Sequence, residues 1–212
     1  MTRFRPTAAD CLVVVDLQND FMPQGALAVP EGDAVVPLVN HLMEGFEHVV
    51  ATQDWHPRDH FSFASTRPGR APFETIEAPY GRQTLWPDHC VQGTPGAAFH
   101  PDFAADRAQL ILRKGFRRDI DSYSAFCEND RRTPTGLTGY LRERGFRRLF
   151  FAGLATDFCV RWSVEDARRE GFEAVIVEDA CRAIDLEGSL AAAQTAMQSA
   201  GAVRLRAADL AG

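Results

Sequence analysis

Cys159 has the clearest chemical context in the sequence. It closes the segment 153–159, which follows a short apolar run, and apolar residues recur after it at helical spacing. Thr156 or Asp157 is the expected cap of that helix, so the thiol is expected in the first turn. Free backbone N–H groups and the helix dipole in that turn favour a thiolate and can hold an oxyanion.

The other four cysteines are interpreted as small buried apolar residues, the commonest environment of a free cysteine. With Cys159 the chain has five cysteines, an odd number, and no two of them form a Cys-x-x-Cys pair. All five are therefore expected to be free thiols. The four are Cys11, Cys90, Cys127 and Cys181.

Asp16 and Lys114 also come directly after apolar runs. A thiol with an ordinary pKa of about 8.5 is mostly protonated at neutral pH. A carboxylate within hydrogen-bond reach can accept its proton, and a lysine can orient that carboxylate and balance its charge. The alternative is an Asp–Lys ion pair that only closes two strand ends. No histidine follows a strand near Cys159, which disfavours a Cys/His dyad.

Asp54, His56 and His89 form a candidate metal set. One carboxylate and two imidazoles hold Zn²⁺, Fe²⁺ or Mn²⁺ and leave positions open for water or a ligand. The set does not distinguish among these metals, and Asp-x-His alone is a weak motif. His60 is open to three interpretations: a further ligand, a donor to a ligand, or a solvated loop residue. The histidines interpreted as surface residues are His41 and His48.

Short apolar runs alternate with helical patterns along the chain, and runs such as 12–15 are apolar throughout. Such runs are typical of strands covered on both faces. The alternation predicts a three-layer α/β/α fold around a mostly parallel, Rossmann-like sheet of six strands. Ligands bind beyond the carboxyl ends of such strands, so the polar residues that follow them are expected to converge there. The predicted strands are Cys11–Asp16, His48–Thr52, Leu110–Arg113, Arg148–Ala152, Ala174–Val177 and Ala202–Leu205, and the predicted helices are Asp33–Phe46, Gly136–Arg144, Asp157–Glu170 and Glu187–Ala200.

Two stretches interrupt this alternation. Residues 54–109 are rich in Trp, His and Pro, and residues 115–135 are polar and loop-like. No internal repeat or linker is visible. We therefore predict a single domain over residues 1–212 with two loop excursions, and long ordered loops of this kind are usually functional.

The composition is that of an ordinary globular protein, with 45% hydrophobic and 25% charged residues. The formal net charge of −6 disfavours nucleic acid and anionic membrane surfaces as partners. No apolar run approaches the roughly 18 residues that a membrane span needs. The first residues show no apolar core or cleavage site of a secretory signal, so a cytoplasmic location is expected.

Taken together, the motifs resemble those of the bacterial nicotinamidases (pyrazinamidases), which belong to the isochorismatase-like cysteine hydrolases. The motifs occur in the same order as in that family, and together they span nearly the whole chain. One local variation is Phe158, where some relatives carry His, and it leaves open the selectivity among pyridine and pyrazine amides. The matching segments are 16–21, 54–57, 60–62, 86–96, 114–115, 121–126 and 153–160.

This resemblance implies hydrolysis of nicotinamide to nicotinate and ammonia, and of pyrazinamide to pyrazinoate, through a thioester on Cys159. Asp16 matches the general base, Lys114 the residue that orients it, and Cys159 the nucleophile. Ala155 and Cys159 match the residues whose N–H groups hold the oxyanion, after a cis peptide bond between Leu154 and Ala155.

The resemblance also implies one divalent metal ion, zinc, iron or manganese, that binds the pyridine nitrogen of the substrate. Asp54, His56 and His89 match its ligands. Aromatic faces suit a flat ring, and the positions that match the lining of the substrate pocket are Phe21, Leu27, Trp86 and Tyr123.

Two other functions stay open as alternatives. Another small-amide hydrolase of the same superfamily, such as one acting on N-carbamoyl compounds, would generally lack the metal set. A non-catalytic metal-binding or partner-binding module is the second, because a fold alone does not determine function. A small molecule is the expected partner. The sequence does not encode the oligomeric state, so a homo-oligomer stays open.

Overall fold

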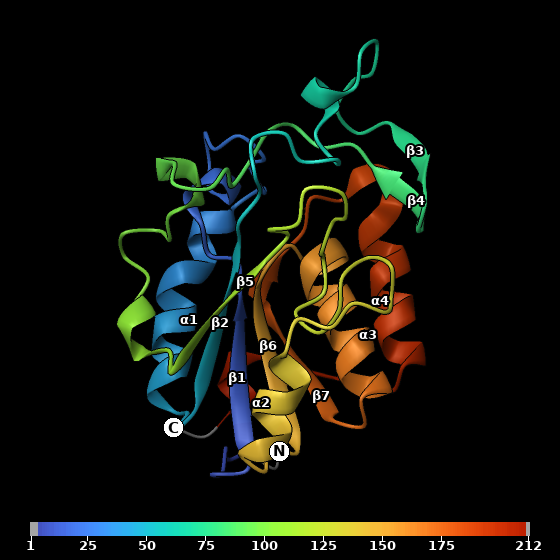
Figure 1. Cartoon of the computed structure of the whole chain (residues 1–212). Coiled ribbons are helices and arrows are strands. Elements are labelled where there is room, and N and C mark those ends of the chain that lie inside the picture. The colour runs from blue at the N-terminus through green and yellow to red at the C-terminus, as the bar shows by residue number, and fades with distance from the viewer. Residues whose placement is uncertain (1–3, 211–212) are drawn as a thin grey trace.

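Six parallel strands form the centre of the structure. The computed structural model describes residues 4–210. The strands lie in the order β5-β2-β1-β6-β7-β8, and every pairing of neighbours is parallel, which confirms the predicted sheet (Figure 1). Their bounds are β1 Asp10–Val15, β2 Val49–Asp54, β5 Leu110–Lys114, β6 Arg148–Leu154, β7 Glu173–Arg182 and β8 Val203–Leu205.

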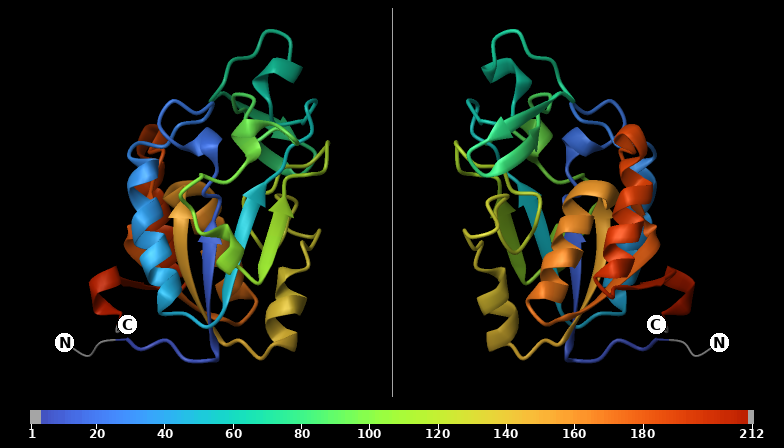
Figure 2. Two further views of the ribbon diagram at one scale, coloured as in Figure 1. Left: turned by 90° about the vertical axis from the view of Figure 1, so that its left-hand side faces the viewer. Right: turned by 90° about the vertical axis from the view of Figure 1, so that its right-hand side faces the viewer.

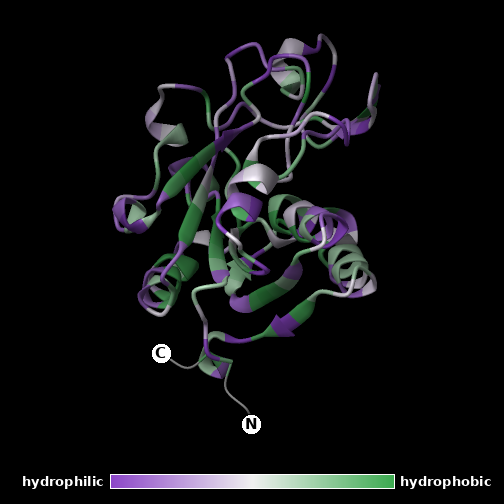
Figure 3. Cartoon of the chain, turned by 60° about the horizontal axis from the view of Figure 1, so that its bottom comes forward, coloured by the Kyte–Doolittle hydropathy of each residue, from purple (hydrophilic) through white to green (hydrophobic). Residues whose placement is uncertain are grey.

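β1 lies in the middle of this sheet and shows why these segments form strands. All six of its residues are buried. Val13, near its centre, pairs with Val50 of β2 on one side and with Phe151 of β6 on the other. Buried positions of this kind favour β-branched and aromatic residues. Accordingly, the central strands are largely hydrophobic, whereas the loops beyond their carboxyl ends carry more hydrophilic residues (Figure 3).

Helices flank the sheet on both faces. α1 and α2 lie on opposite sides of the strands (Figure 2), and α3 packs against β7 and against α4. This arrangement confirms the predicted three layers. No helix within residues 4–210 is both long enough and apolar enough to cross a membrane. The helices are α1 Val35–Glu44, α2 Leu137–Glu143, α3 Arg161–Arg169 and α4 Ser189–Ser199.

Short turns of other types precede three of these helices, which therefore start later than predicted. The 3-10 turns Gly32–Ala34 and Leu186–Gly188 precede α1 and α4. A π-helical turn, Thr156–Val160, precedes α3 and has no side-chain cap. The prediction that Thr156 or Asp157 caps this helix is therefore wrong. The Asp157 carboxylate instead accepts hydrogen bonds from the segment that leads into α4.

Some strands extend further than predicted. β2 and β6 each continue two residues past their expected ends at Thr52 and Ala152. β7 continues past Val177 to Arg182, and its register with β6 shifts on the way. The charged pair 178–179 interrupts the apolar pattern and so hides this extension in the sequence.

The excursion over residues 54–109 contains an antiparallel hairpin that the sequence analysis did not predict. Its strands are β3 Thr75–Ala78 and β4 Gly81–Thr84. Most of their residues are exposed or half-buried. β3 alternates between polar and apolar over only four residues, and β4 has no apolar residue besides Gly81, so the strand signal is weak. Residues 115–135, all of which the structure describes, contain no helix or strand.

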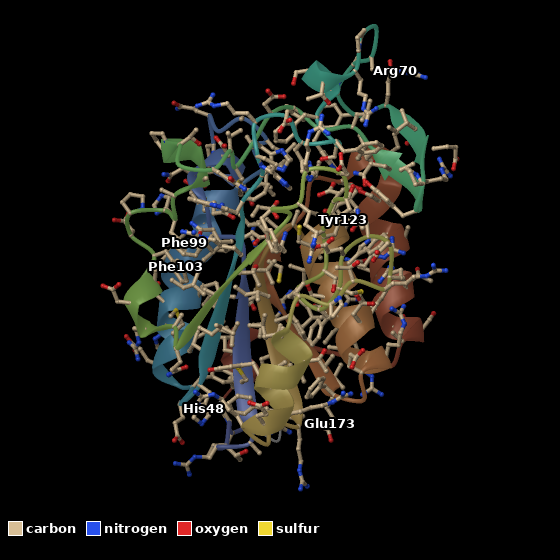
Figure 4. The ribbon with its side chains drawn as sticks, in the orientation of Figure 1. His48, Arg70, Phe99, Phe103, Tyr123 and Glu173 are labelled. Carbon is tan, nitrogen blue, oxygen red and sulfur yellow. The ribbon has the colours of Figure 1, made fainter. Side chains whose placement is uncertain are left out.

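The carboxyl ends of the strands bring the predicted site residues together. Asp16 follows β1, Asp54 ends β2, and Lys114 ends β5. Cys159 lies in the π turn that follows β6. Tyr123, from the loop after β5, lies toward the same end of the sheet (Figure 4). This is the edge at which parallel α/β sheets bind ligands.

Gly153 allows β1 and β6 to approach closely just before this edge. Its φ of 121° is one that only glycine adopts readily. A Cβ atom at this position would lie 2.1 Å from the backbone oxygen of Val15. Both the backbone conformation and the contact with β1 therefore require glycine.

We expect Gly153→Ala to lower the free energy of unfolding by roughly 3 kcal/mol or more, because a backbone clash and an unfavourable φ must both be relieved. Gly139→Ala is the matched control, since Gly139 lies in α2 and a Cβ atom there meets nothing within 4 Å. The free energy of unfolding of this control should rise by about 0.5–1 kcal/mol, because alanine favours a helix more than glycine does. Urea denaturation followed by circular dichroism measures both. Equal stability of the two variants would show that the close approach is unimportant.

Candidate active site

Lys114 lies at the centre of a buried charge cluster. Its Nζ is 2.8 Å from Asp16 Oδ2 and 2.5 Å from Asp54 Oδ1, and all three side chains are buried. Buried charges are stable only when they are paired. Burial lowers the pKa of Lys114, but the two carboxylates outweigh this effect and raise it well above its usual value. One ammonium group thus holds two carboxylates at the ends of different strands.

Two further buried side chains hold these aspartates, one through the carboxylate and one through the backbone. Thr52 Oγ1 donates a hydrogen bond of 2.6 Å to Asp16 Oδ1. Gln18 accepts from the backbone N–H of Asp54 at 2.7 Å and donates to the Asp54 carbonyl at 2.8 Å. Neither Thr52 nor Gln18 was predicted as a site residue, although Gln18 lies within the motif 16–21. Thr52 follows an apolar run and Gln18 lies among polar residues, and neither pattern identifies the partner of the side chain.

Cys159 reaches the same cluster from the π turn. Its Sγ lies 3.3 Å from Lys114 Nζ. One candidate ligand atom each of Asp16, Asp54 and Cys159 lies within 4.8 Å of the others. Ser163 Oγ donates to the Cys159 carbonyl at 2.6 Å and so ties the turn to α3. The structure therefore brings Asp16, Lys114 and Cys159 together, and their catalytic roles stay a prediction.

The protonation of this cluster differs from the sequence-based expectation. Burial raises the pKa of the Cys159 thiol well above its usual value, and the Lys114 ammonium offsets this effect only in part. The expected bias toward a thiolate is therefore wrong. Burial also raises the pKa of the Asp16 carboxyl, against the effect of Lys114. A buried carboxylate of raised pKa beside a protonated thiol is suited to take the proton as the sulfur attacks.

Asp54, His56 and His89 offer a donor set that fits a divalent metal ion. Asp54 Oδ2 lies 3.4 Å from His56 Nε2 and 3.7 Å from His89 Nε2. The Nδ1 atoms of the two rings lie 2.9 Å from the Gly115 carbonyl and 2.8 Å from the Pro87 carbonyl. A ring that donates through Nδ1 keeps a lone pair on Nε2, the usual state of a metal-binding histidine. Three buried ligands facing one point leave positions for a substrate or water.

His60 is buried beside this set. Its Nδ1 lies 2.8 Å from Ser62 Oγ, its Nε2 lies 3.2 Å from the Ile120 carbonyl, and its ring centre is 4.3 Å from that of His56. Burial and the neighbouring His56 lower its pKa to about 4. The interpretation of His60 as a solvated loop residue is therefore wrong. Both ring nitrogens have protein partners, so His60 packs against His56 as a neutral side chain.

An aromatic pocket adjoins the charge cluster. The Trp86 ring packs edge-on against Phe158, with 4.8 Å between ring centres, and against Tyr123, with 6.1 Å. Cys159 lines the same pocket, so its sulfur faces a space with largely apolar walls. The lining residues are Phe21, Leu27, Asp54, His56, Trp86, His89, Asp121, Tyr123, Ala155, Phe158, Cys159 and Ile184.

Gln83 of the unpredicted hairpin fixes part of this wall. It is 1% exposed although most of the hairpin faces solvent. Its Nε2 donates to Tyr123 Oη at 2.9 Å and to Asp121 Oδ2 at 2.8 Å. Trp86 Nε1 donates to the same Tyr123 hydroxyl at 3.0 Å. Gln83 was not predicted as a site residue, because nothing in the sequence of a polar hairpin distinguishes its one buried side chain.

The peptide bond between Leu154 and Ala155 is cis, as the resemblance implied. Ala155 directly precedes the π turn and lines the pocket together with Cys159. The two residues expected to hold an oxyanion therefore both line the pocket.

A family model described as an isochorismatase domain matches residues 10–209. The chain belongs to the isochorismatase family. It is 53% identical over 194 residues to a nicotinamidase from Acinetobacter baylyi. This match covers 92% of this chain and 91% of that protein. A solved nicotinamidase/pyrazinamidase from Acinetobacter baumanii has a TM-score of 0.95 and 55% identity, and covers 96% of this chain and 98% of that one.

Two further solved structures similar to this isochorismatase-family chain contain small ligands. A protein from L. infantum in complex with nicotinate has a TM-score of 0.86 at 38% identity, and covers 99% of this chain and 98% of that one. A pyrazinamidase from Pyrococcus horikoshii in complex with zinc has a TM-score of 0.75 at 37% identity, and covers 93% of this chain and 99% of that one.

Replacing Lys114 leaves two buried carboxylates without their cation. We expect Lys114→Met to lower the free energy of unfolding by roughly 3–5 kcal/mol, as measured by urea denaturation. Arg113→Met is the neighbouring control, because the exposed Arg113 stacks over Trp55 and should cost about 1 kcal/mol or less.

Adding Asp16→Asn to the Lys114→Met protein should recover part of the lost stability, since it removes one of the two uncompensated charges. A Lys114→Met protein as stable as the Arg113→Met control would contradict the assignment of Lys114 as the cation that holds the cluster together.

Proposed function

We propose that this protein is a nicotinamidase, an amidohydrolase that converts nicotinamide to nicotinate and ammonia and acts on pyrazinamide in the same way. The observation that carries the proposal is the placement of Cys159, which lines an aromatic pocket and contacts the buried Lys114–Asp16 pair. Aromatic walls suit a flat heteroaromatic ring. The nicotinamidases similar to this chain and the nicotinate complex support the same substrate class.

In the first half of the reaction, Cys159 Sγ attacks the carboxamide carbon while Asp16 takes the thiol proton. Lys114 keeps Asp16 oriented and balances the charge of the cluster. The C–S bond forms as the carbonyl electron pair moves onto oxygen, and the backbone N–H groups of Ala155 and Cys159 hold that oxyanion. Asp16 then gives its proton to the amide nitrogen as the C–N bond breaks, so ammonia leaves and a thioester remains.

In the second half, water attacks the thioester carbon and Asp16 takes the proton of the water. The C–S bond breaks, the proton on Asp16 passes to the Cys159 sulfur, and the product leaves as nicotinate once its carboxyl proton is released to water. Asp16 thus acts as base and acid twice in one cycle, a role that its raised pKa supports.

Asp54, His56 and His89 would hold one divalent metal ion at the pocket. When bound, such an ion supplies a Lewis-acidic anchor for the ring nitrogen of the substrate. The carbonyls of Gly115 and Pro87 keep the two imidazoles oriented for this task. Zinc, iron and manganese share this donor chemistry, and zinc is the first to test because the Pyrococcus horikoshii relative was solved with it.

The test of the proposal is ammonia release from nicotinamide by the purified protein with zinc, iron or manganese supplied. We expect Cys159→Ala to lower kcat by about 10⁴-fold or more, because it removes the nucleophile. Cys127→Ala is the matched control, since Cys127 hydrogen-bonds Asp166 outside the pocket, and it should keep the parent rate. A parent protein that releases no ammonia with any of the three metals would contradict the proposal and direct the search to other small amides.

Removal of the metal tests the proposed role of Asp54, His56 and His89 as its ligands. Chelator-treated protein should lose at least about tenfold in kcat/KM for nicotinamide, because the substrate ring loses its anchor. One equivalent of zinc should restore the loss, with elemental analysis counting the bound metal. Full activity in protein shown to be metal-free would overturn the assignment of Asp54, His56 and His89.

A further inference from the structure

Asp157 is a buried carboxylate that has no part in the hydrolysis proposed above. It lies in the π turn two residues before Cys159, and it is 1% exposed. A carboxylate in such a position needs several donors to offset the loss of water. The partners of Asp157 are three hydrogen-bond donors from one distant segment, residues 184–189.

These three bonds join the turn that carries Cys159 to the segment between β7 and α4. The backbone N–H of Ile184 donates to Asp157 Oδ1 at 3.1 Å, and that of Asp185 donates to Oδ2 at 2.7 Å. The Ser189 hydroxyl donates to the same Oδ2 at 2.5 Å. The donors lie 27, 28 and 32 residues after Asp157 in the chain, so the bonds are tertiary contacts.

The segment that receives these bonds has an unusual backbone. Asp185 and Glu187 have φ values of 56° and 49°, and Gly188 follows with 84°. Positive φ is uncommon for residues other than glycine and persists where surrounding contacts impose it. Because Asp185 and Glu187 are both exposed, packing of their side chains does not impose this conformation. The bonds from Asp185 and Ser189 to Asp157 hold the two ends of this stretch, and the Leu190 N–H also donates to the Asp185 carboxylate.

Ile184, the first residue of the segment, lines the same pocket as Cys159. The side chain of Ile184 is half-buried and packs against the hydrophobic core. Its backbone N–H is held by Asp157. This hydrogen bond and the packing together set where the side chain lies at the pocket.

We propose that Asp157 is a positioning residue that holds Ile184 against the pocket and so sets the distance between this wall and Cys159. The proposal rests on the amide hydrolysis proposed above. Asp157 touches neither the substrate nor the reacting atoms in this account. Its effect reaches the substrate ring through the Ile184 side chain.

The conservative variant Asp157→Asn keeps the shape but turns one acceptor oxygen into an amide donor, which opposes an N–H or O–H group of the segment. We expect KM for nicotinamide in the zinc-loaded enzyme to rise about tenfold while kcat falls by less than about threefold, because an apolar contact to the ring is lost. Asp185→Asn is the matched control, since the Asp185 carboxylate accepts only a bond of 3.2 Å from the Leu190 N–H at the surface. It should leave both constants unchanged.

A double-mutant cycle tests whether Asp157 acts through Ile184. Ile184→Ala alone should also raise KM about tenfold, and the combined variant should raise it by less than about twofold more, because the contact is already lost. Effects of the two substitutions that multiply would overturn the proposal. A fall in Tm of Asp157→Asn with unchanged KM and kcat would overturn it as well, since the role would then be purely structural.

A measurement without substrate separates this proposal from the proposed function. Alkylation of Cys159 by iodoacetamide, followed by peptide mass spectrometry, should be several-fold faster in Asp157→Asn than in Asp185→Asn, because a released wall opens the way to the sulfur. A parent protein that releases no ammonia refutes the hydrolysis, and the alkylation rates then still decide the role of Asp157. Equal rates would refute that role.

If Asp157→Asn does not fold, Ser189→Ala removes only one of the three donors. It should raise KM by about twofold to threefold and speed the alkylation of Cys159 in the same direction. A Ser189→Ala enzyme identical to the parent in both measurements would overturn the proposal.

Discussion

The Lys114 ammonium group, shared between Asp16 and Asp54, is the interaction on which the rest of the site depends. A buried cation needs anionic partners, and here those partners end two other strands of the same sheet. The cluster therefore sets the relative position of three strand ends. Because Asp16 faces Cys159 and Asp54 faces the two histidines, one charged group aligns the proposed acid–base chemistry with the proposed metal site.

Around this cluster, polar contacts from three separate segments complete the pocket. Gln18 holds the backbone of Asp54, Gln83 holds Tyr123, and Asp157 holds the backbone of Ile184. Each is a buried side chain that binds the backbone or the hydroxyl of a residue far away in sequence. The walls of the pocket are thus largely apolar and continuous with the hydrophobic core, and hydrogen bonds behind them add to the packing that fixes the shape of the cavity.

Much of this arrangement could be predicted from the sequence, because parallel strands deliver the residues that follow them to one edge. Asp16, Lys114 and Cys159 were found in this way, and motif resemblance supplied the wall residues. Contacts set by tertiary structure could not be predicted. Gln83 looks like any polar residue of a hairpin, and the π turn before α3 has the same apolar spacing as an α-helical start. The raised pKa of Cys159 depends on burial, which a helix-dipole argument does not include.

The central place of β1 in the sheet has a consequence for how the protein is made. β1 pairs with β6, whose first residue, Arg148, lies 138 residues after Asp10. At a synthesis rate of about 5–20 residues per second, the ribosome needs roughly 7–28 s to supply that partner. During this interval the nascent chain carries an apolar strand, Leu12 to Val15, with one edge unpaired. An unpaired apolar edge can pair with another chain, so the nascent protein is most prone to aggregation before β6 is made.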